Sequence, residues 1–166
     1  MSRPAYLPTG TVVGKSYEIR RPLSQGGMGA VYVAVQIATQ KERALKVMRP
    51  DLLSSPKMRE RFVQEAQIGA RIESEHVVEV IDAGVDEDSG TPWLAMELLR
   101  GQTLSARVQE HGPIALEETA EIVRELCHAV GAAHTVGIVH RDLKPDNVFI
   151  ADTKREIGRA SCRERV

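Results

Sequence analysis

The chain has few of the residues that hold together disulfide-rich domains or cross a membrane. Only two of its 166 residues are cysteines, Cys127 and Cys162, and aromatic residues make up 4%. Two cysteines provide neither a disulfide framework nor the spacing of a metal site. The longest apolar stretch is interrupted by Glu97 and Arg100, so it is too short to cross a bilayer. We therefore expect no disulfide framework, no zinc site and no membrane segment.

The chain also lacks an excess of charge of either sign. Its 22 basic and 23 acidic residues leave a formal net charge of -1. Such a balance provides no electrostatic footprint for nucleic acid or an anionic membrane, so we expect no nucleic-acid partner and only local phosphate binding. Residues 1–10 contain no basic segment followed by an apolar one, as a secretory signal would. We expect a cytoplasmic location, with which a membrane anchor downstream in a full-length protein remains compatible.

Residues typical of strands dominate the first part of the chain. Short segments rich in Val, Ile, Tyr and Leu are separated by Gly-rich or polar turns, a pattern that predicts antiparallel strands. After Pro50 the period changes, and Met58, Phe62 and Ala66 recur at helical spacing behind a start signal near Pro56. The sequence thus predicts one amphipathic helix between the third and fourth strands. The expected strands are 17–24, 30–38, 41–48, 77–85 and 93–99.

Helical spacing dominates from Thr103 onward. This pattern predicts a helix that ends near Val136, because Gly137 is suited to terminate it. Strands first and helices afterwards predict an α+β protein with two unequal lobes. The expected buried face of the second helical region carries Leu116, Ala120, Val123, Cys127 and Val130.

The segment from His140 to Asn147 reads HRDLKPDN. It resembles the H-R-D-L-x-x-x-N catalytic loop of protein kinases. Phosphoryl transfer needs a carboxylate that accepts the proton of the substrate hydroxyl and an amide oxygen that helps to hold Mg²⁺. The resemblance implies that Asp142 is this catalytic base and that Asn147 is a metal ligand. Lys144 stands where serine/threonine kinases carry a lysine that contacts the transferring phosphate, so the resemblance favours Ser and Thr as acceptors.

A second motif precedes it, between two expected strands. Residues 24–31 read SQGGMGAV and resemble the G-x-G-x-x-G-x-V loop that covers the phosphates of ATP. A Gly-rich run is on its own also typical of an ordinary hairpin turn. Beside the catalytic loop, the resemblance implies that Gly26, Gly27, Gly29 and Val31 bind the nucleotide. Ser24 replaces the first glycine of the motif, and we expect nucleotide binding to survive this change.

A lysine in the third expected strand completes the phosphate site. Ala44-Leu45-Lys46 resembles the V-A-I-K signature, whose lysine pairs with the α- and β-phosphates. The family holds this lysine with a glutamate of the following helix, and the resemblance implies Glu65 for this role. Glu60 is the nearest competitor, but it lies close to the start of the helix.

The end of the fifth expected strand resembles the hinge of the kinase family. By this resemblance, backbone groups at Glu97 and near Leu99 would meet the edge of the adenine, and Met96 would lie beside the nucleotide pocket. The signal has low specificity, because an apolar strand that ends before a glycine is common.

Residues 10–16 read GTVVGKS and resemble a Walker A loop. That motif needs four residues between its glycines and a strand before the first glycine. This segment has only three residues between its glycines, and no strand is expected before it. We therefore expect Lys15 and Ser16 to form a turn that leads into the first strand.

The resemblance extends over about Tyr17 to Ile150 and implies a two-lobed protein-kinase fold. It predicts a complete five-stranded small lobe with one helix of the αC type, and only the start of the helical large lobe. No D-F-G motif follows Ile150, and residues 156–166 match a translated sequencing adapter. The expected regions are a flexible lead (1–16), the small lobe (17–101), an incomplete large lobe (102–155) and a non-native tail (156–166).

The function implied is that of a bacterial serine/threonine protein kinase. Such an enzyme uses ATP and Mg²⁺ to transfer the γ-phosphoryl group to Ser or Thr hydroxyls of protein substrates. Because the D-F-G aspartate is missing, we expect the 166-residue chain itself to be inactive as a fragment. One alternative is a non-catalytic pseudokinase that binds nucleotide or serves as a scaffold. Another is that the chain has no stable fold of its own.

Overall fold

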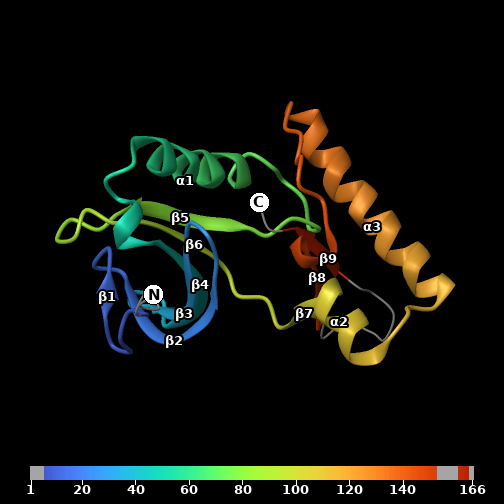
Figure 1. Cartoon of the computed structure of the whole chain (residues 1–166), viewed down its shortest axis with the longest axis horizontal. Helices are drawn as coiled ribbons and strands as arrows, with labels where there is room; N and C mark the ends of the chain where they lie inside the picture. Colours follow the sequence, from blue (N-terminus) through green and yellow to red (C-terminus); the bar gives the residue numbers. More distant parts are fainter. Residues whose placement is uncertain (1–5, 153–160, 165–166) are drawn as a thin grey trace. The chain divides into compact units, whose positions relative to one another are not determined.

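The computed structural model describes residues 6–152 and 161–164, so the expectations for residues 1–5, 153–160 and 165–166 lie outside it. The chain forms two compact units (Figure 1). The first unit runs through Gln67 and resumes over Glu79–Leu98. The second unit comprises Ile68–Val78 and the chain from Leu99 onward.

The first unit is built on a curled antiparallel sheet of six strands in the order β1-β2-β3-β4-β6-β5 (Figure 1). Five of these strands confirm the predicted small-lobe sheet, with ends that differ by a few residues. The sixth, β1, was not predicted. The strands are β1 Val12–Val13, β2 Tyr17–Gln25, β3 Gly29–Gln36, β4 Lys41–Met48, β5 Val80–Val85 and β6 Pro92–Glu97.

Both faces of this sheet are covered. The inner face of the curl buries a core that includes Tyr17, Leu45 and Trp93. The other face packs against helix α1, Pro56–Gly69, which follows the short 3-10 turn η1, Pro50–Leu52. Phe62 and Ala66 of α1 are buried against Met48 and Leu94 of the sheet, as the helical spacing predicted.

The segment before β2 is folded onto the sheet, although we expected residues 1–16 to be a flexible lead. Val13 is buried, and the Gly14 N–H donates a 2.8 Å hydrogen bond to Oδ2 of Asp86. This hydrogen bond is the main reason that the pKa of the Asp86 carboxyl group is lowered. Gly14 has a positive φ of 57°, and a Cβ there would lie 2.5 Å from Nε1 of Trp93. Only glycine allows the chain to pass so close to this indole, and a turn then leads into β2 as predicted.

The second unit combines a small sheet with two helices. Its three strands pair in the order β7-β8-β9, and the 3-10 turn η2, Pro145–Asn147, precedes β8. We expected no strand in the tail from residue 156, but β9 lies there and pairs with β8. The elements are β7 Gly101–Thr103, α2 Leu104–His111, α3 Leu116–Thr135, β8 Val148–Ala151 and β9 Ser161–Glu164.

Helix α3 ends as predicted but buries a different face. Gly137 follows it with a φ of 77°, and the Ile138 N–H donates to the Ala133 carbonyl. The side chains of Leu116 and Val123, which we expected to be buried, are 78% and 50% exposed. The helix is apolar on more than one side, so spacing alone does not select the packed face. The buried residues are Ile122, Ala129 and Ala133.

Among the described residues, no helix combines the length and the hydropathy that crossing a bilayer requires.

We expect Gly14→Ala to destabilise the first unit more than Gly10→Ala does. Both glycines have positive φ, so both changes strain the backbone by roughly 1–2 kcal/mol. A Cβ at residue 14 also collides with Trp93, whereas a Cβ at residue 10 meets nothing within 4 Å. Overpacking of this kind costs about 1–3 kcal/mol more. Urea unfolding followed by the fluorescence of Trp93, the only tryptophan, measures both free energies; equal losses would contradict the collision.

Candidate active site

Strand β4 places Lys46 in the middle of a row of side chains. Lys46 pairs with Val31 of β3 on one side and with Leu94 of β6 on the other. Side chains alternate along a strand, so all three lie on the face that α1 covers, together with Met96. The register thus brings the predicted nucleotide residues Val31 and Lys46 side by side.

The ammonium group of Lys46 lies over an aromatic ring of α1. Its Nζ atom is 5.7 Å from the centroid of the Phe62 ring, which is within the range of a cation–π interaction. Sequence reasoning assigned Phe62 only to the core. Its signal was the helical spacing, which puts it one turn before Glu65. The side chain of Glu65 lies outside the described part of the structure, so its pairing with Lys46 stays a prediction.

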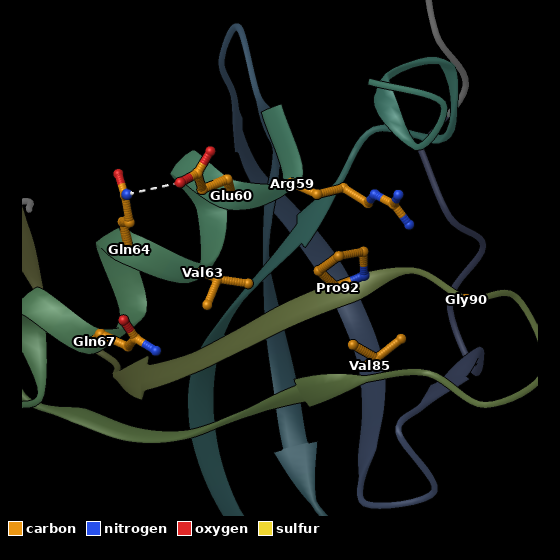
Figure 2. A pocket seen from close by; sticks show the side chains of 8 residues that line it. All are labelled: Arg59, Glu60, Val63, Gln64, Gln67, Val85, Gly90 and Pro92. Atoms are coloured by element: carbon orange, nitrogen blue, oxygen red, sulfur yellow. Dashed lines mark hydrogen bonds between the residues drawn. The ribbon is translucent and has the colours of Figure 1, made fainter. Parts of the chain in front are cut away.

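The competitor Glu60 lines a shallow groove of about 480 Å³ between α1 and the β5–β6 hairpin (Figure 2). Its carboxylate accepts a 3.4 Å hydrogen bond from Nε2 of Gln64 and is exposed. This placement argues against Glu60 as the partner of Lys46. Among the predicted nucleotide-binding residues whose side chains the structure describes, none lines this groove. Its lining residues are Arg59, Glu60, Val63, Gln64, Gln67, Val85, Gly90 and Pro92.

The glycines between β2 and β3 serve two different purposes. The Gly26 N–H donates a 2.8 Å hydrogen bond to the Gly29 carbonyl and closes the turn. A Cβ at Gly29 would lie within 3 Å of the Val47 carbonyl oxygen, so β3 and β4 can approach each other only with glycine there. Gly26 and Gly27 are exposed, and a Cβ at either residue would meet no atom closer than 3.9 Å, so phosphates have room to approach the backbone there.

Strand β6 ends at Glu97, the first residue of the expected hinge. The Glu97 N–H donates a 3.0 Å hydrogen bond to the Glu79 carbonyl. Oε1 of the Glu97 side chain accepts a 2.9 Å hydrogen bond from the Glu79 N–H. Leu99, the other expected hinge residue, belongs to the second unit.

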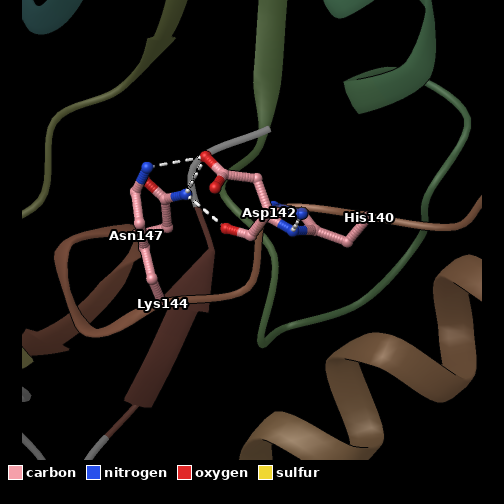
Figure 3. A network of polar contacts seen from close by, with 4 residues as sticks. All are labelled: His140, Asp142, Lys144 and Asn147. Carbon is pink, nitrogen blue, oxygen red and sulfur yellow. Dashed lines mark hydrogen bonds and ion pairs between the residues drawn. The ribbon is translucent and has the colours of Figure 1, made fainter.

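The loop before β8 in the second unit is closed by its own polar groups (Figure 3). Arg141 has a φ of 64°, an uncommon conformation for a residue with a side chain. The Asp142 N–H then donates a 3.2 Å hydrogen bond to Nδ1 of His140. The Asn147 N–H donates a 2.9 Å hydrogen bond to the Lys144 carbonyl within η2. These bonds bring Asp142, Lys144 and Asn147 together.

The carboxylate of Asp142 is the centre of this loop (Figure 3). Lys144 Nζ lies 2.8 Å from its Oδ2 atom, and Asn147 Nδ2 lies 3.3 Å from the same atom. Asn147 Nδ2 also donates a 2.8 Å hydrogen bond to the Asp142 carbonyl. The Lys144 hydrogen bond is the main reason that the Asp142 pKa is lowered, and Asp142 in turn raises the Lys144 pKa.

This arrangement suits both predicted roles. Asp142 is exposed and ionised at neutral pH, so it can accept a proton from a hydroxyl within hydrogen-bond reach. Because Nδ2 of Asn147 is directed at Asp142, the Oδ1 atom is the amide atom that remains for a cation. Amide and carboxylate oxygens are ligands that Mg²⁺ accepts, so the residues present fit this ion.

A family model described as "Protein kinase domain" matches residues 17–158 of the chain, which includes the first residues of the stretch that we expected to be a non-native tail. The probable serine/threonine-protein kinase PknB of Corynebacterium glutamicum is 38% identical over 144 residues, 86% of the chain. The serine/threonine-protein kinase PknE of Mycobacterium tuberculosis is 38% identical over 135 residues, 81% of the chain. The chain spans only 22% and 24% of these two relatives.

A solved structure supports the same relationship. The crystal structure of the Mycobacterium tuberculosis PknI kinase domain matches the chain with a TM-score of 0.71 and 28% sequence identity. The match covers 89% of the chain and 60% of the solved domain. The predicted fold class, α+β with a strand-rich small lobe, is confirmed by this likeness.

We expect Lys144→Met to raise the pKa of Asp142 toward its ordinary value of about 3.9. The lysine supplies the hydrogen bond and the positive charge that favour the ionised carboxylate, and methionine supplies neither. A carbon-13 NMR titration of the carboxyl groups measures the change. Lys41→Met, which removes an exposed lysine of the first unit, is the control and leaves the Asp142 pKa unchanged. An unaltered titration in Lys144→Met would show that this ion pair is absent in solution.

Proposed function

The chain belongs to the protein kinase family, and from this premise we propose that the protein transfers the γ-phosphoryl group of ATP to Ser or Thr hydroxyls of protein substrates. The observation that carries the proposal is the convergence of Lys144 and Asn147 on the Asp142 carboxylate. A base, a cation and a metal-binding amide within one short loop match the needs of phosphoryl transfer.

In the proposed reaction, Asp142 accepts a hydrogen bond from the acceptor hydroxyl and takes its proton as the oxygen attacks the γ-phosphorus. The bond from the γ-phosphorus to the β–γ bridging oxygen breaks at the same time, and ADP leaves with that oxygen. Lys144 holds the carboxylate ionised before the transfer and neutralises charge on the γ-phosphoryl group during it. Asn147 Oδ1 would hold Mg²⁺, which when bound supplies charge neutralisation to the phosphates. The relatives named as serine/threonine kinases support Ser and Thr as acceptors.

Apart from Leu99, the proposed nucleotide-binding residues lie in the first unit. The exposed backbone at Gly26 and Gly27 would approach the phosphates, and Lys46 would pair with the α- and β-phosphates. Val31 and Met96 lie on the same sheet face as Lys46 and would contact the adenine through apolar surface. Cross-strand pairing supports this grouping, because it places the charged Lys46 side chain next to the apolar side chain of Val31 on the same face of the sheet.

The 166 residues contain no D-F-G motif, which in kinases supplies a metal-binding aspartate. We therefore propose that the chain by itself transfers no phosphate. A non-catalytic scaffold is the alternative for the whole protein, but Lys46, Asp142 and Asn147 are all present and argue for catalysis.

We expect Asp142→Asn in the full-length protein to reduce kcat by roughly 10²- to 10⁴-fold, because an amide cannot accept the hydroxyl proton. ATP affinity stays near the wild-type value, since the carboxylate acts on the hydroxyl. Transfer of labelled phosphate to a protein substrate measures kcat, and titration calorimetry measures ATP binding. Asp146→Asn, which removes an exposed carboxylate of the same loop, is the matched control and retains kcat.

Undiminished turnover in Asp142→Asn would refute the assignment of the base. Robust turnover by the unaltered 166-residue chain would refute the proposal that this chain is inactive alone.

A further inference from the structure

The last rung of the ladder between β5 and β6 is formed in part by a side chain. Val80 pairs with Met96, so the next residues, Glu79 and Glu97, stand opposite each other. In a regular antiparallel ladder such a pair exchanges two main-chain hydrogen bonds. One of these two bonds is present: the Glu97 N–H donates a 3.0 Å hydrogen bond to the Glu79 carbonyl. The Glu79 N–H instead donates to Oε1 of the Glu97 side chain, at 2.9 Å.

The side chain therefore takes the donor that the ladder would direct to the Glu97 carbonyl. The N–H and C=O groups of one residue in an extended strand point to the same edge, so this carbonyl faces the side of β5 on which Glu79 lies. A carboxylate is a stronger hydrogen-bond acceptor than a main-chain carbonyl, so the Glu79 N–H donates to the carboxylate. A register shift between Val80 and Asp82 already interrupts β5 here, so the ladder ends irregularly at this point.

We propose that the Glu97 carboxylate is a positioning group for adenine recognition. By binding the Glu79 N–H, it prevents that donor from competing with the 6-amino group of ATP for the Glu97 carbonyl. The same hydrogen bond fixes the end of β6 relative to β5 and thereby fixes the direction of the carbonyl. The inference rests on the proposed function, because it assumes that ATP binds with its adenine at this strand end.

A purely structural role for the carboxylate predicts a different result. If the hydrogen bond only secured the start of β5, its loss would weaken every nucleotide by a similar factor. The proposal instead predicts a loss that depends on the 6-amino group. Purine riboside triphosphate, which has hydrogen in place of that amino group, separates the two roles.

The test measures the affinities of ATP and of purine riboside triphosphate, each with Mg²⁺, by titration calorimetry on the full-length protein. We expect Glu97→Leu to weaken ATP about 5- to 10-fold, as expected for one hydrogen bond. The affinity for purine riboside triphosphate changes less than about 2-fold, since this ligand offers no amino group. Glu97→Gln keeps an Oε1 acceptor for the Glu79 N–H and restores ATP affinity to near the wild-type value.

Glu87→Leu is the matched control, because it makes the same substitution in the same hairpin at an exposed residue that pairs with exposed Lys15. It leaves both affinities unchanged. Equal weakening of both ligands by Glu97→Leu, or no weakening of ATP, would overturn the inference while leaving the proposed function intact. A wild-type protein that binds neither ligand would overturn the proposed function, and the inference with it.

Discussion

The pairing register of β4 is the constraint on which the first unit depends. β4 lies between β3 and β6, and its side chains alternate between two cores. Leu45 and Val47 face the inner core, whereas Met48 packs under α1, on the face that Lys46 shares. A shift of one residue would bury the Lys46 ammonium among Tyr17 and the other inner residues. Burying an unpaired charge in that core would be very unfavourable. The packing of Leu45 and Val47 in the inner core therefore keeps Lys46 on the α1 face.

The loop in the second unit follows another physical principle. Asp142 is exposed, so neither burial nor a low dielectric places its carboxylate. Its partners are instead two and five residues away in the chain, and η2 folds them back onto it. Exposed ion pairs contribute little to stability, so this geometry is suited to orient and charge a reactive group rather than to hold the fold together. The position of Lys46 in the first unit thus originates in core packing, whereas the position of Asp142 in the second unit originates in local sequence.

This difference explains what could be predicted from the sequence. The strand-type composition of residues 41–48 between turns predicted β4 with the bounds observed, and the spacing of Phe62 and Ala66 predicted the buried face of α1. The two-residue strand β1 was missed because its pairing depends on Gly14 passing over Trp93, which lies far away in the chain. The prediction of the buried face of α3 was wrong because several sides of that helix are apolar. Strand β9 was missed because its four residues, Ser-Cys-Arg-Glu, contain no strand period.

The same distinction applies within the site. The contacts of Asp142 are local and fall within the motif from His140 to Asn147, from which the sequence could name these residues but not their hydrogen bonds. The contact between Glu97 and Glu79 spans 18 residues and exists only because the β5–β6 hairpin brings the two together. A motif names Glu97 for its backbone, but no spacing rule shows that its carboxylate occupies the neighbouring N–H. A side chain that takes the place of a main-chain acceptor in a sheet can therefore be identified only when the pairing register is known, even where the family resemblance is strong.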